Sequence, residues 1–323
     1  MDLPPLLRAA VEAELAGTPL ADLQRAGETL SGRYRAETRD GRLHLSDDLF
    51  AKAYAAARLP ATYAALRACL EAVAGALPDF APTGLLDVGA GPGTALWAAT
   101  DAFPRLDAAT LLEASDPIRR LGARLGEGAF DFRPDWRAGD LATGLGALPQ
   151  ADLVTLSYVL DEIAPQAIGP LADALWSKTA SVLLVVEPGT PAGWRRILAV
   201  RDRLIAAGAH IVAPCPHALA CPIVSPDWCH FAQRLPRSRL HLRTKEAEVP
   251  FEDEKFAYVA LAREAPAGSA FTRVLAPPHA GSGKVRLKLC RPDGTATDTL
   301  VTKRDGDGFR RARRANWGDR LPF

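Results

Sequence analysis

The sequence of 323 residues contains no long hydrophobic run. No stretch reaches the roughly 18 consecutive apolar residues that a membrane-spanning helix requires. Residues 1–5, Met-Asp-Leu-Pro-Pro, also lack the basic start and the following apolar run of a secretory signal. From these absences we expect a cytoplasmic protein that has no membrane partner.

The sequence also has almost no net charge, because 39 Lys and Arg residues face 38 Asp and Glu residues. Attraction to a nucleic acid must therefore come from local clusters of basic residues. Two clusters are present, and they comprise Arg234, Arg237, Arg239, Arg243 and Lys245, and then Lys303, Arg304, Arg310, Arg311, Arg313 and Arg314. Clustered arginines suit phosphate contacts and stacking on unpaired bases, which favours RNA over DNA as the partner. A merely solvated basic face is the alternative interpretation.

Cysteine is scarce, and its five residues are unevenly distributed along the chain. Cys69 lies in an apolar helical pattern, where a small buried side chain is expected. The other four lie in the C-terminal half of the chain. Disulfides are disfavoured in a reducing compartment, so these four indicate a metal site or a catalytic group.

The periodicity divides the chain into three parts. Residues 1–79 follow a helical pattern with a polar break at residues 38–42, and we expect an N-terminal helical segment. Residues 80–265 alternate short apolar runs with helical patterns such as residues 192–207, which predicts a doubly wound α/β sheet. The expected strands are residues 85–88, 109–112, 153–156, 182–186, 210–212 and 256–261.

Two further segments interrupt or follow this α/β pattern. Residues 214–254 are rich in Cys, Pro, His and Arg and have no clear periodicity, so we expect an insertion that something functional must order. Residues 266–323 predict a small β-containing extension, with a hairpin formed by residues 284–289 and 297–302 around Arg-Pro-Asp-Gly, followed by a basic tail.

A glycine-rich turn follows the first expected strand. Residues 87–94 read Asp-Val-Gly-Ala-Gly-Pro-Gly-Thr, with glycines at 89, 91 and 93. The dinucleotide fingerprint would need a glycine at 94, where this chain has Thr. The string instead resembles the first motif of class I S-adenosylmethionine (SAM) methyltransferases. That resemblance implies a Rossmann-like sheet and a SAM site formed by Asp87, Gly89, Gly91 and Gly93.

Polar residues at later strand ends extend this predicted SAM site. Glu113 ends the second strand, where a carboxylate can accept hydrogen bonds from ribose hydroxyls. By resemblance to the same class, Asp140 would lie near the adenine, and Ser157 and Tyr158 would face the methyl group. The Asn/Asp-Pro-Pro-aromatic motif of amino-directed nucleic-acid methyltransferases is absent at Ser157-Tyr158. SAM binding is therefore predicted, whereas the sequence identifies no catalytic residue.

The spacing of the four C-terminal cysteines favours one metal centre. Cys215, Cys221 and Cys229 are separated by five and seven residues, and Cys290 follows much later. Four thiolates can hold a tetrahedral zinc ion or a four-iron four-sulfur (4Fe–4S) cluster. Wide gaps and a distant fourth ligand favour the cluster over the tight knuckles of structural zinc sites. Zinc stays open, because His217 or His230 could replace a thiolate.

Several motifs together resemble one family, the methyltransferase-like mitochondrial ribosomal small-subunit protein twenty-two family. These motifs are residues 215–234, the glycine turn, Glu-Pro-Gly-Thr at 187–190, Lys-Arg-Asp-Gly at 303–306 and Trp-Gly-Asp at 317–319. The resemblance implies a 4Fe–4S cluster on the four cysteines and a role on small-subunit rRNA in ribosome assembly or translation. An active rRNA methyltransferase, or a small-molecule methyltransferase with a zinc site, are the alternatives.

Overall fold

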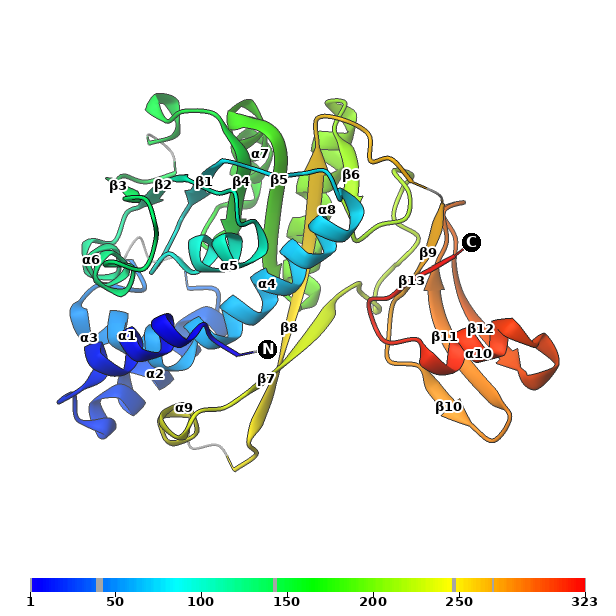
Figure 1. Ribbon diagram of the computed structural model, residues 1–323, viewed down its shortest axis with the longest axis horizontal. Coiled ribbons are helices and arrows are strands. Elements are labelled where there is room, and N and C mark those ends of the chain that lie inside the picture. Colours follow the sequence, from blue (N-terminus) through cyan, green and yellow to red (C-terminus); the bar gives the residue numbers. More distant parts are fainter. Residues whose placement is uncertain (1, 39–42, 142–143, 246–247, 269, 323) are drawn as a thin grey trace.

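The N-terminal part of the chain is helical in the computed structural model, which describes residues 2–38, 43–141, 144–245, 248–268 and 270–322 (Figure 1). Its helices are α1 (Pro5–Leu15), α2 (Leu20–Arg35), α3 (Asp48–Ala57) and α4 (Leu59–Ala76). Asp47 starts α3 by accepting a hydrogen bond from the amide of Phe50 at 2.9 Å, as an N-cap side chain does. Most of the polar break at residues 38–42 lies outside the described residues. The predicted N-terminal helices are confirmed.

The central part forms an eight-stranded sheet, and the six strands expected from the apolar runs are all present. These are β1 (Gly84–Val88), β2 (Ala108–Glu113), β4 (Ala151–Ser157), β5 (Thr179–Pro188), β6 (His210–Ala213) and β8 (Phe251–Ala262). The strand order is β3-β2-β1-β4-β5-β8-β6, where β3 is Asp135–Ala138. Strands β1 to β5 are parallel, whereas β8 runs antiparallel to β5 and β6. The doubly wound α/β fold is thereby confirmed.

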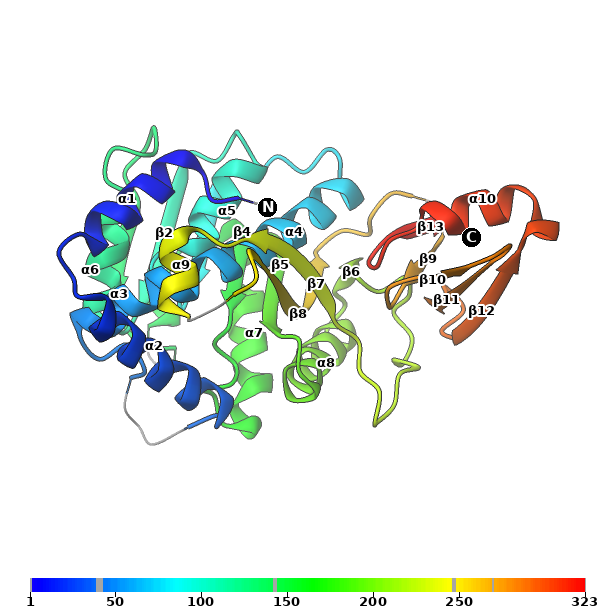
Figure 2. The same ribbon diagram turned by 90° about the horizontal axis from the view of Figure 1, so that it is seen from below.

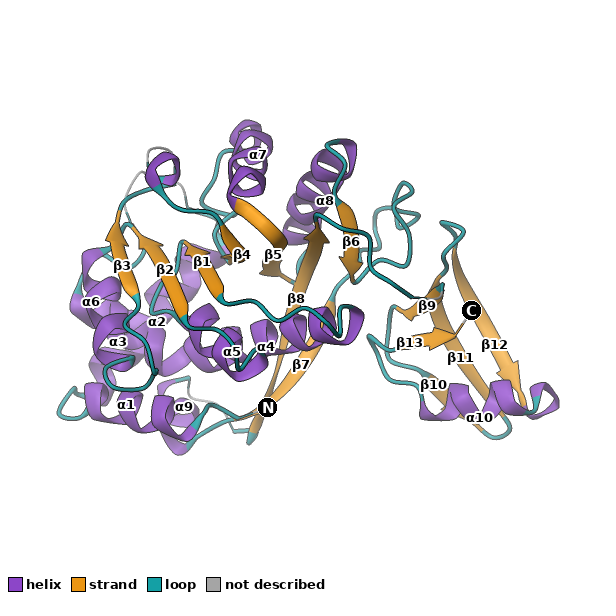
Figure 3. Ribbon diagram, turned by 45° about the horizontal axis from the view of Figure 1, so that its top comes forward, coloured by secondary structure: helices purple, strands orange, loops and turns teal. Residues whose placement is uncertain are grey.

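Helices cover both faces of this sheet (Figure 3). They include α5 (Thr94–Ala102), α6 (Asp116–Leu125), α7 (Ile168–Lys178) and α8 (Pro191–Ala206). One core joins the N-terminal helices, α5 and α6 to one face, and a second core joins α7 and α8 to the other. The apolar runs are continuous because successive residues of a strand, such as Leu85 and Leu86, enter opposite cores. No helix among the described residues is both long and apolar enough to cross a bilayer.

The segment predicted as an irregular insertion is partly regular. It contains β7 (Phe231–Pro236) and α9 (Arg239–Thr244), and β7 pairs antiparallel with the first half of β8. The lack of periodicity gave no sign of these elements, because β7 is a short strand whose hydrogen bonds come from a partner in β8. Residues 214–230 remain a loop between β6 and β7.

The C-terminal part forms a second sheet beside the first (Figure 2). Its order is β10-β11-β9-β13, with β12 on the other side of β11. The bounds are β9 (Phe271–Val274), β10 (His279–Gly281), β11 (Lys284–Cys290), β12 (Ala296–Thr302) and β13 (Arg320–Pro322). The predicted hairpin is β11–β12 and is confirmed. The segment predicted as a basic tail instead forms a helix, α10 (Asp307–Arg314), whose Phe309 and Ala312 pack on this sheet.

Candidate functional site

The predicted SAM-binding glycines form the turn between β1 and α5. Gly89, Gly91 and Gly93 have φ values of 67°, 53° and 77°, a region that favours glycine. A Cβ at Gly89 would lie 2.6 Å from the Val159 side chain, so that glycine is required for close packing. A Cβ at Gly91 would meet no described atom within 4 Å, so the turn is open to an incoming ligand there.

Glu113, at the end of β2, lies directly beside this turn. Its two carboxylate oxygens accept hydrogen bonds from the amides of Gly91 and Ser115, at 2.8 and 2.7 Å. Burial raises the pKa of Glu113, whereas these amide hydrogen bonds oppose the rise. The structure therefore brings the predicted ribose acceptor and the glycine turn together.

Asp87 is the buried acidic group of the turn, with none of its surface exposed. Its Oδ1 accepts a hydrogen bond from the Thr155 hydroxyl at 2.7 Å, while its Oδ2 has no partner among the described residues. Burial raises the pKa of Asp87 to about 7. A buried acceptor without a partner is costly, so Oδ2 is suited to a donor on a bound ligand.

The other predicted SAM contacts lie at the same edge of the sheet, but their surroundings differ. Asp140 is exposed just beyond β3, which neighbours Glu113 through the β2–β3 pairing. Tyr158 follows Ser157 at the end of β4 with a φ of 58°, rare for a non-glycine residue. The Tyr158 hydroxyl donates to Glu254 at 3.2 Å, and Glu254 also pairs with Arg58. The phenol is thus engaged in an ion-pair network.

A cluster of acidic residues at this edge was not predicted from the sequence. Glu187, at the end of β5, accepts hydrogen bonds from the amides of Val159 and Leu160 and pairs with Arg196 at 2.8 Å. Burial, together with Asp161, raises the pKa of Glu187 to about 7 even though Arg196 opposes the rise. Desolvation and Asp161 also raise the pKa of neighbouring Glu162 to about 7, although 39% of this side chain is exposed. The edge that carries the predicted SAM site is therefore acidic.

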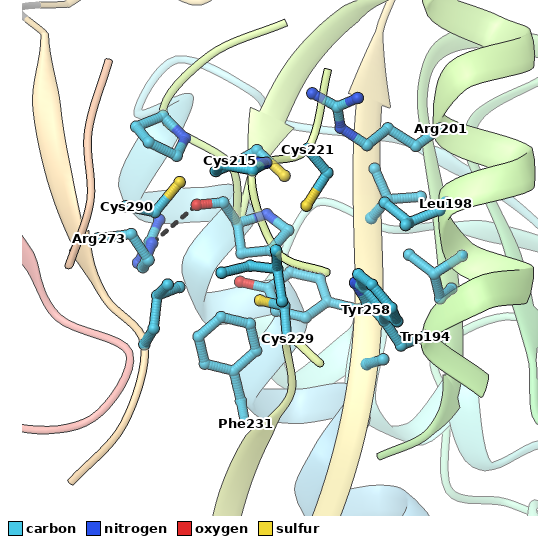
Figure 4. A pocket seen from close by; sticks show the side chains of 18 of the residues that line it. Trp194, Leu198, Arg201, Cys215, Cys221, Cys229, Phe231, Tyr258, Arg273 and Cys290 are labelled. Atoms are coloured by element: carbon cyan, nitrogen blue, oxygen red, sulfur yellow. Dashed lines mark hydrogen bonds between the residues drawn. The ribbon is translucent and has the colours of Figure 1, made fainter. Parts of the chain in front are cut away.

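The four predicted metal-binding cysteines line a single pocket (Figure 4). Cys215 and Cys221 lie in the loop after β6, Cys229 lies just before β7, and Cys290 ends β11. The remaining lining comes from α8, the start of β7, β8, β9 and the adjoining loops, and it is mainly apolar, with Trp194, Phe231 and Leu275 among its residues. Segments far apart in the sequence therefore deliver all four thiols to one place.

The four thiols are free and close enough to affect one another electrostatically. Burial raises the pKa of Cys229 well above its usual value, and Cys215, Cys221 and Cys290 add to the rise. Burial, Cys215 and Cys221 likewise raise the pKa of Cys290 to about 12. Among the described residues, no three His, Cys, Asp or Glu side chains are already arranged to hold one metal ion.

The two histidines predicted as alternative ligands occupy different environments. The Nε2 atom of His217 lies 3.4 Å from the Cys290 sulfur, inside the pocket. Burial, together with Arg201, lowers the pKa of His217, which favours the neutral imidazole that binds metals. His230 instead stacks on Trp228 and meets Trp317 edge-on, at ring distances of 5.0 and 4.9 Å. Cys69 is fully buried in α4, as predicted.

The two predicted RNA-binding clusters differ in how their charges are used. In the first cluster, Arg234 forms a bidentate pair with Asp253, while Arg237 and Lys245 pair with Glu252. Much of the positive charge of this cluster is thus balanced by acids of β8. In the second cluster all six side chains, namely those of Lys303, Arg304, Arg310, Arg311, Arg313 and Arg314, are exposed. Of these six, only Arg310 pairs with an acidic residue, Asp307, within the part of the chain that the structure describes.

The sheet and its first turn define the class of protein. Strands β1 to β5 are parallel, and the antiparallel strand β8 lies between β5 and the edge strand β6. This is the arrangement of class I SAM-dependent methyltransferases. The glycine turn after β1 and the acidic residue that ends β2 stand where that class binds SAM. The chain belongs to the family described as mitochondrial small ribosomal subunit Rsm22, whose family model matches residues 48–322.

Two curated relatives are similar along most of this chain. Ribosome assembly protein METTL17, mitochondrial, from Homo sapiens, is 30% identical over 297 residues, which cover 83% of this chain and 62% of that protein. Rsm22-cox11 tandem protein 2, mitochondrial, from Schizosaccharomyces pombe, is 23% identical over 289 residues, which cover 74% and 38%. This chain therefore spans less than two thirds of the length of either relative.

Solved methyltransferase structures are more distant. Magnesium protoporphyrin IX methyltransferase from Synechocystis PCC 6803, with bound SAM, is 11% identical with a TM-score of 0.41, covering 77% of this chain and all of that one. The mitomycin 7-O-methyltransferase MmcR is 19% identical with a TM-score of 0.41, covering 81% and 74%. The strand order of this chain, rather than these distant likenesses, carries the fold assignment.

The buried Asp87 generates a prediction on stability. Its pKa of about 7 in the folded chain exceeds the ordinary value of 3.8, so its ionisation destabilises the fold as the pH rises between these values. Asp87→Asn removes the ionisable group and with it the decrease in folding stability as the pH rises. The stability of this variant relative to the wild type should therefore increase by about 3 kcal/mol between pH 5 and pH 8.

Urea unfolding of the SAM-free proteins at both pH values measures this difference. Asp152→Asn is the control, because hydrogen bonds from Thr83 and Gly84 lower the pKa of Asp152. Its effect on stability should not change over this pH range. A pH-independent difference for Asp87→Asn would contradict the assigned burial of a titrating carboxyl group.

Proposed function

We propose that this protein binds SAM and a 4Fe–4S cluster and contacts rRNA during assembly of the small ribosomal subunit. The carrying observation is that four free thiols from separate segments line one pocket, where the basic C-terminal sheet meets the main sheet. Family membership supports the assembly role, since the human relative is named a ribosome assembly protein. Its predicted cytoplasmic location stays a prediction.

The donor set of the pocket fits a thiolate-bound metal group. Cys215, Cys221, Cys229 and Cys290 would supply the four thiolates that such a cluster requires. The apolar lining would limit access of water, and His217 offers a polar neighbour to Cys290. When bound, a cluster supplies a stable inorganic link between these segments, so that its binding contributes to folding.

Replacement of a single ligand tests the cluster. Cys290→Ser should remove the visible absorption of anaerobically purified protein, remove most of its iron and sulfide and lower its melting temperature, because one ligand is lost. Cys69→Ser is the matched control and should keep the colour, since Cys69 lies in α4 away from the pocket. Spectra and metal and sulfide analysis give the answer.

Two outcomes would contradict the assignment in different ways. A colourless wild-type protein with one zinc per chain would exclude the cluster and retain the four-cysteine site. A full cluster in Cys290→Ser would show that another residue is the fourth ligand, and His217 would be the next candidate because of its place beside Cys290.

The proposed SAM site rests on the open turn at Gly91, the adjacent Glu113 and the unpartnered oxygen of Asp87. Glu113 would accept hydrogen bonds from the ribose, and Asp140 would lie near the adenine. Methyl transfer is not part of the proposal. The Tyr158 hydroxyl, which the sequence places near the methyl group, is bonded to Glu254.

Substitution at the turn tests the SAM site. Gly91→Val should abolish SAM binding measured by calorimetry, because a branched side chain would fill the open space over the turn. Gly17→Val is the matched control. Gly17 also has positive φ (77°) and open space around a Cβ, but it lies between α1 and α2. Its variant should suffer similar backbone strain and still bind SAM. Failure of the anaerobically prepared wild type to bind SAM would contradict the assignment.

The proposed RNA contact rests on a segregation of charge along the chain. Residues 266–323 carry 12 Lys and Arg against 5 Asp and Glu, a net charge of +7, whereas residues 1–265 carry 27 against 33, a net charge of −6. Phe309 and Ala312 lie on the side of α10 that packs on the C-terminal sheet. The arginines of α10 are exposed. A basic surface of this kind binds phosphates through counterion release.

Charge reversal on α10 tests this contact. Arg311→Glu, Arg313→Glu and Arg314→Glu together should weaken binding to small-subunit rRNA and reduce the slope of log affinity against log salt by about two. The control reverses three exposed arginines elsewhere, namely Arg105, Arg133 and Arg195, and gives the same change in net charge. Equal effects in both variants would show that only net charge matters and that α10 is no binding surface.

A further inference from the structure

Two buried arginines flank the cysteine pocket from opposite sides (Figure 4). Arg201 comes from α8 and is 2% exposed, and Arg273 comes from β9 and is 5% exposed. The β9–β11 pairing places Arg273 directly opposite Cys290. Arginine is rarely buried without a negative partner, so each of these charges requires an explanation.

Both arginines hold the backbone of the cysteine loop. Arg201 donates hydrogen bonds to the carbonyl oxygens of His217 and Leu219, at 3.1 and 2.6 Å. Arg273 donates to the carbonyl oxygen of Pro214, the residue before Cys215, at 2.8 Å, and also to that of Gly318. The loop that carries three of the cysteines is therefore tied to α8 and to the C-terminal sheet through these two side chains.

The carbonyl partners of the two arginines carry no net charge, so the positive charges of these arginines stay largely unbalanced. Arg201 pairs with Asp202 at 2.5 Å, but the Asp202 side chain is 60% exposed and its charge is well hydrated. Arg273 pairs with no acidic residue among those that the structure describes. The thiols lie beside these charges, because both arginines line the pocket together with the four cysteines.

We propose that Arg201 and Arg273 are the built-in counter-charges of the four-cysteine site. Four thiolates with a [4Fe–4S]²⁺ core, or with Zn²⁺, carry a net charge of −2, which two guanidinium groups balance. The inference rests on the metal site of the proposed function but holds for either metal. Each arginine acts as a positioning residue that lowers the electrostatic free energy of the buried, negatively charged site. For a cluster, the positive charge also favours the reduced form, which carries one more negative charge.

Paired substitutions separate charge from shape. Arg201→Gln and Arg273→Gln keep a hydrogen-bond donor and remove the charge, whereas Arg201→Lys and Arg273→Lys keep the charge and lose the planar fork. Arg263→Gln is the control. Arg263 also donates to two carbonyl oxygens, those of Trp176 and Thr179, and it is not part of the cysteine pocket.

The measurements are metal and sulfide content, the rate of metal loss to a chelator, and the midpoint potential from an anaerobic redox titration followed by electron paramagnetic resonance. Each Gln variant should lose metal about tenfold faster than the wild type. In each Gln variant that retains a cluster, the ratio of reduced to oxidised cluster at a given potential should fall about tenfold. This corresponds to a midpoint potential that is lower by about 59 mV for a one-electron couple. The Lys variants and Arg263→Gln should stay close to the wild type.

Each outcome decides the proposal. Equal metal loss in the Lys and Gln variants would overturn it, because the arginines would then act only as clamps for the loop. Wild-type potential and metal retention in the Gln variants would also overturn it. Zinc in the wild type would refute the cluster, while chelator competition would still test the counter-charges. Wild-type protein that holds neither metal would refute both proposals.

Discussion

The convergence of four cysteine side chains is the constraint on which the junction of the two sheets depends. Cys215, Cys221 and Cys229 belong to the loop between β6 and β7, and Cys290 ends a strand of the other sheet. Two buried arginines point their charge toward the same place. Apolar packing alone does not account for buried guanidinium groups beside thiols, whereas the proposed thiolate-bound metal group would account for both.

This junction also determines how the proposed sites relate to one another. Strand β6 runs parallel to β5, so Cys215 lies at the same edge of the sheet as the glycine turn after β1. Four strand spacings of about 4.8 Å separate β1 from β6, roughly 19 Å in all. Between them, the Trp228 indole donates to the carbonyl oxygen of Gly189, which follows β5. The two proposed sites are separate but lie along one edge of the sheet.

Much of the fold could be predicted from the sequence because local patterns determine it. The strands of the main sheet are buried on both faces and read as short apolar runs, and the turn Arg-Pro-Asp-Gly indicates the hairpin β11–β12. Strands β3 and β7 gave no such signal, because β3 is largely exposed and β7 depends on β8 for its hydrogen bonds.

Of the residues in the candidate sites, only those with a recognisable spacing could be predicted from the sequence. Glycine and cysteine spacing indicated the turn and the four thiols, but no local pattern shows that Arg201 and Arg273 lie inside, since Arg201 belongs to an ordinary amphipathic helix. The pairing of Arg234 with Asp253 was missed for a similar reason. Their proximity comes from the β7–β8 register, which links residues 19 positions apart.

Anomalous diffraction from crystals of anaerobically purified protein tests the central claim most directly. Data collected above and below the iron absorption edge would place any iron relative to the cysteine sulfurs. The account predicts a strong iron signal bounded by the sulfurs of Cys215, Cys221, Cys229 and Cys290, with Arg201 and Arg273 on its two sides. An iron signal elsewhere in the molecule, or a metal-free pocket in crystals of protein purified with its native metal, would contradict it.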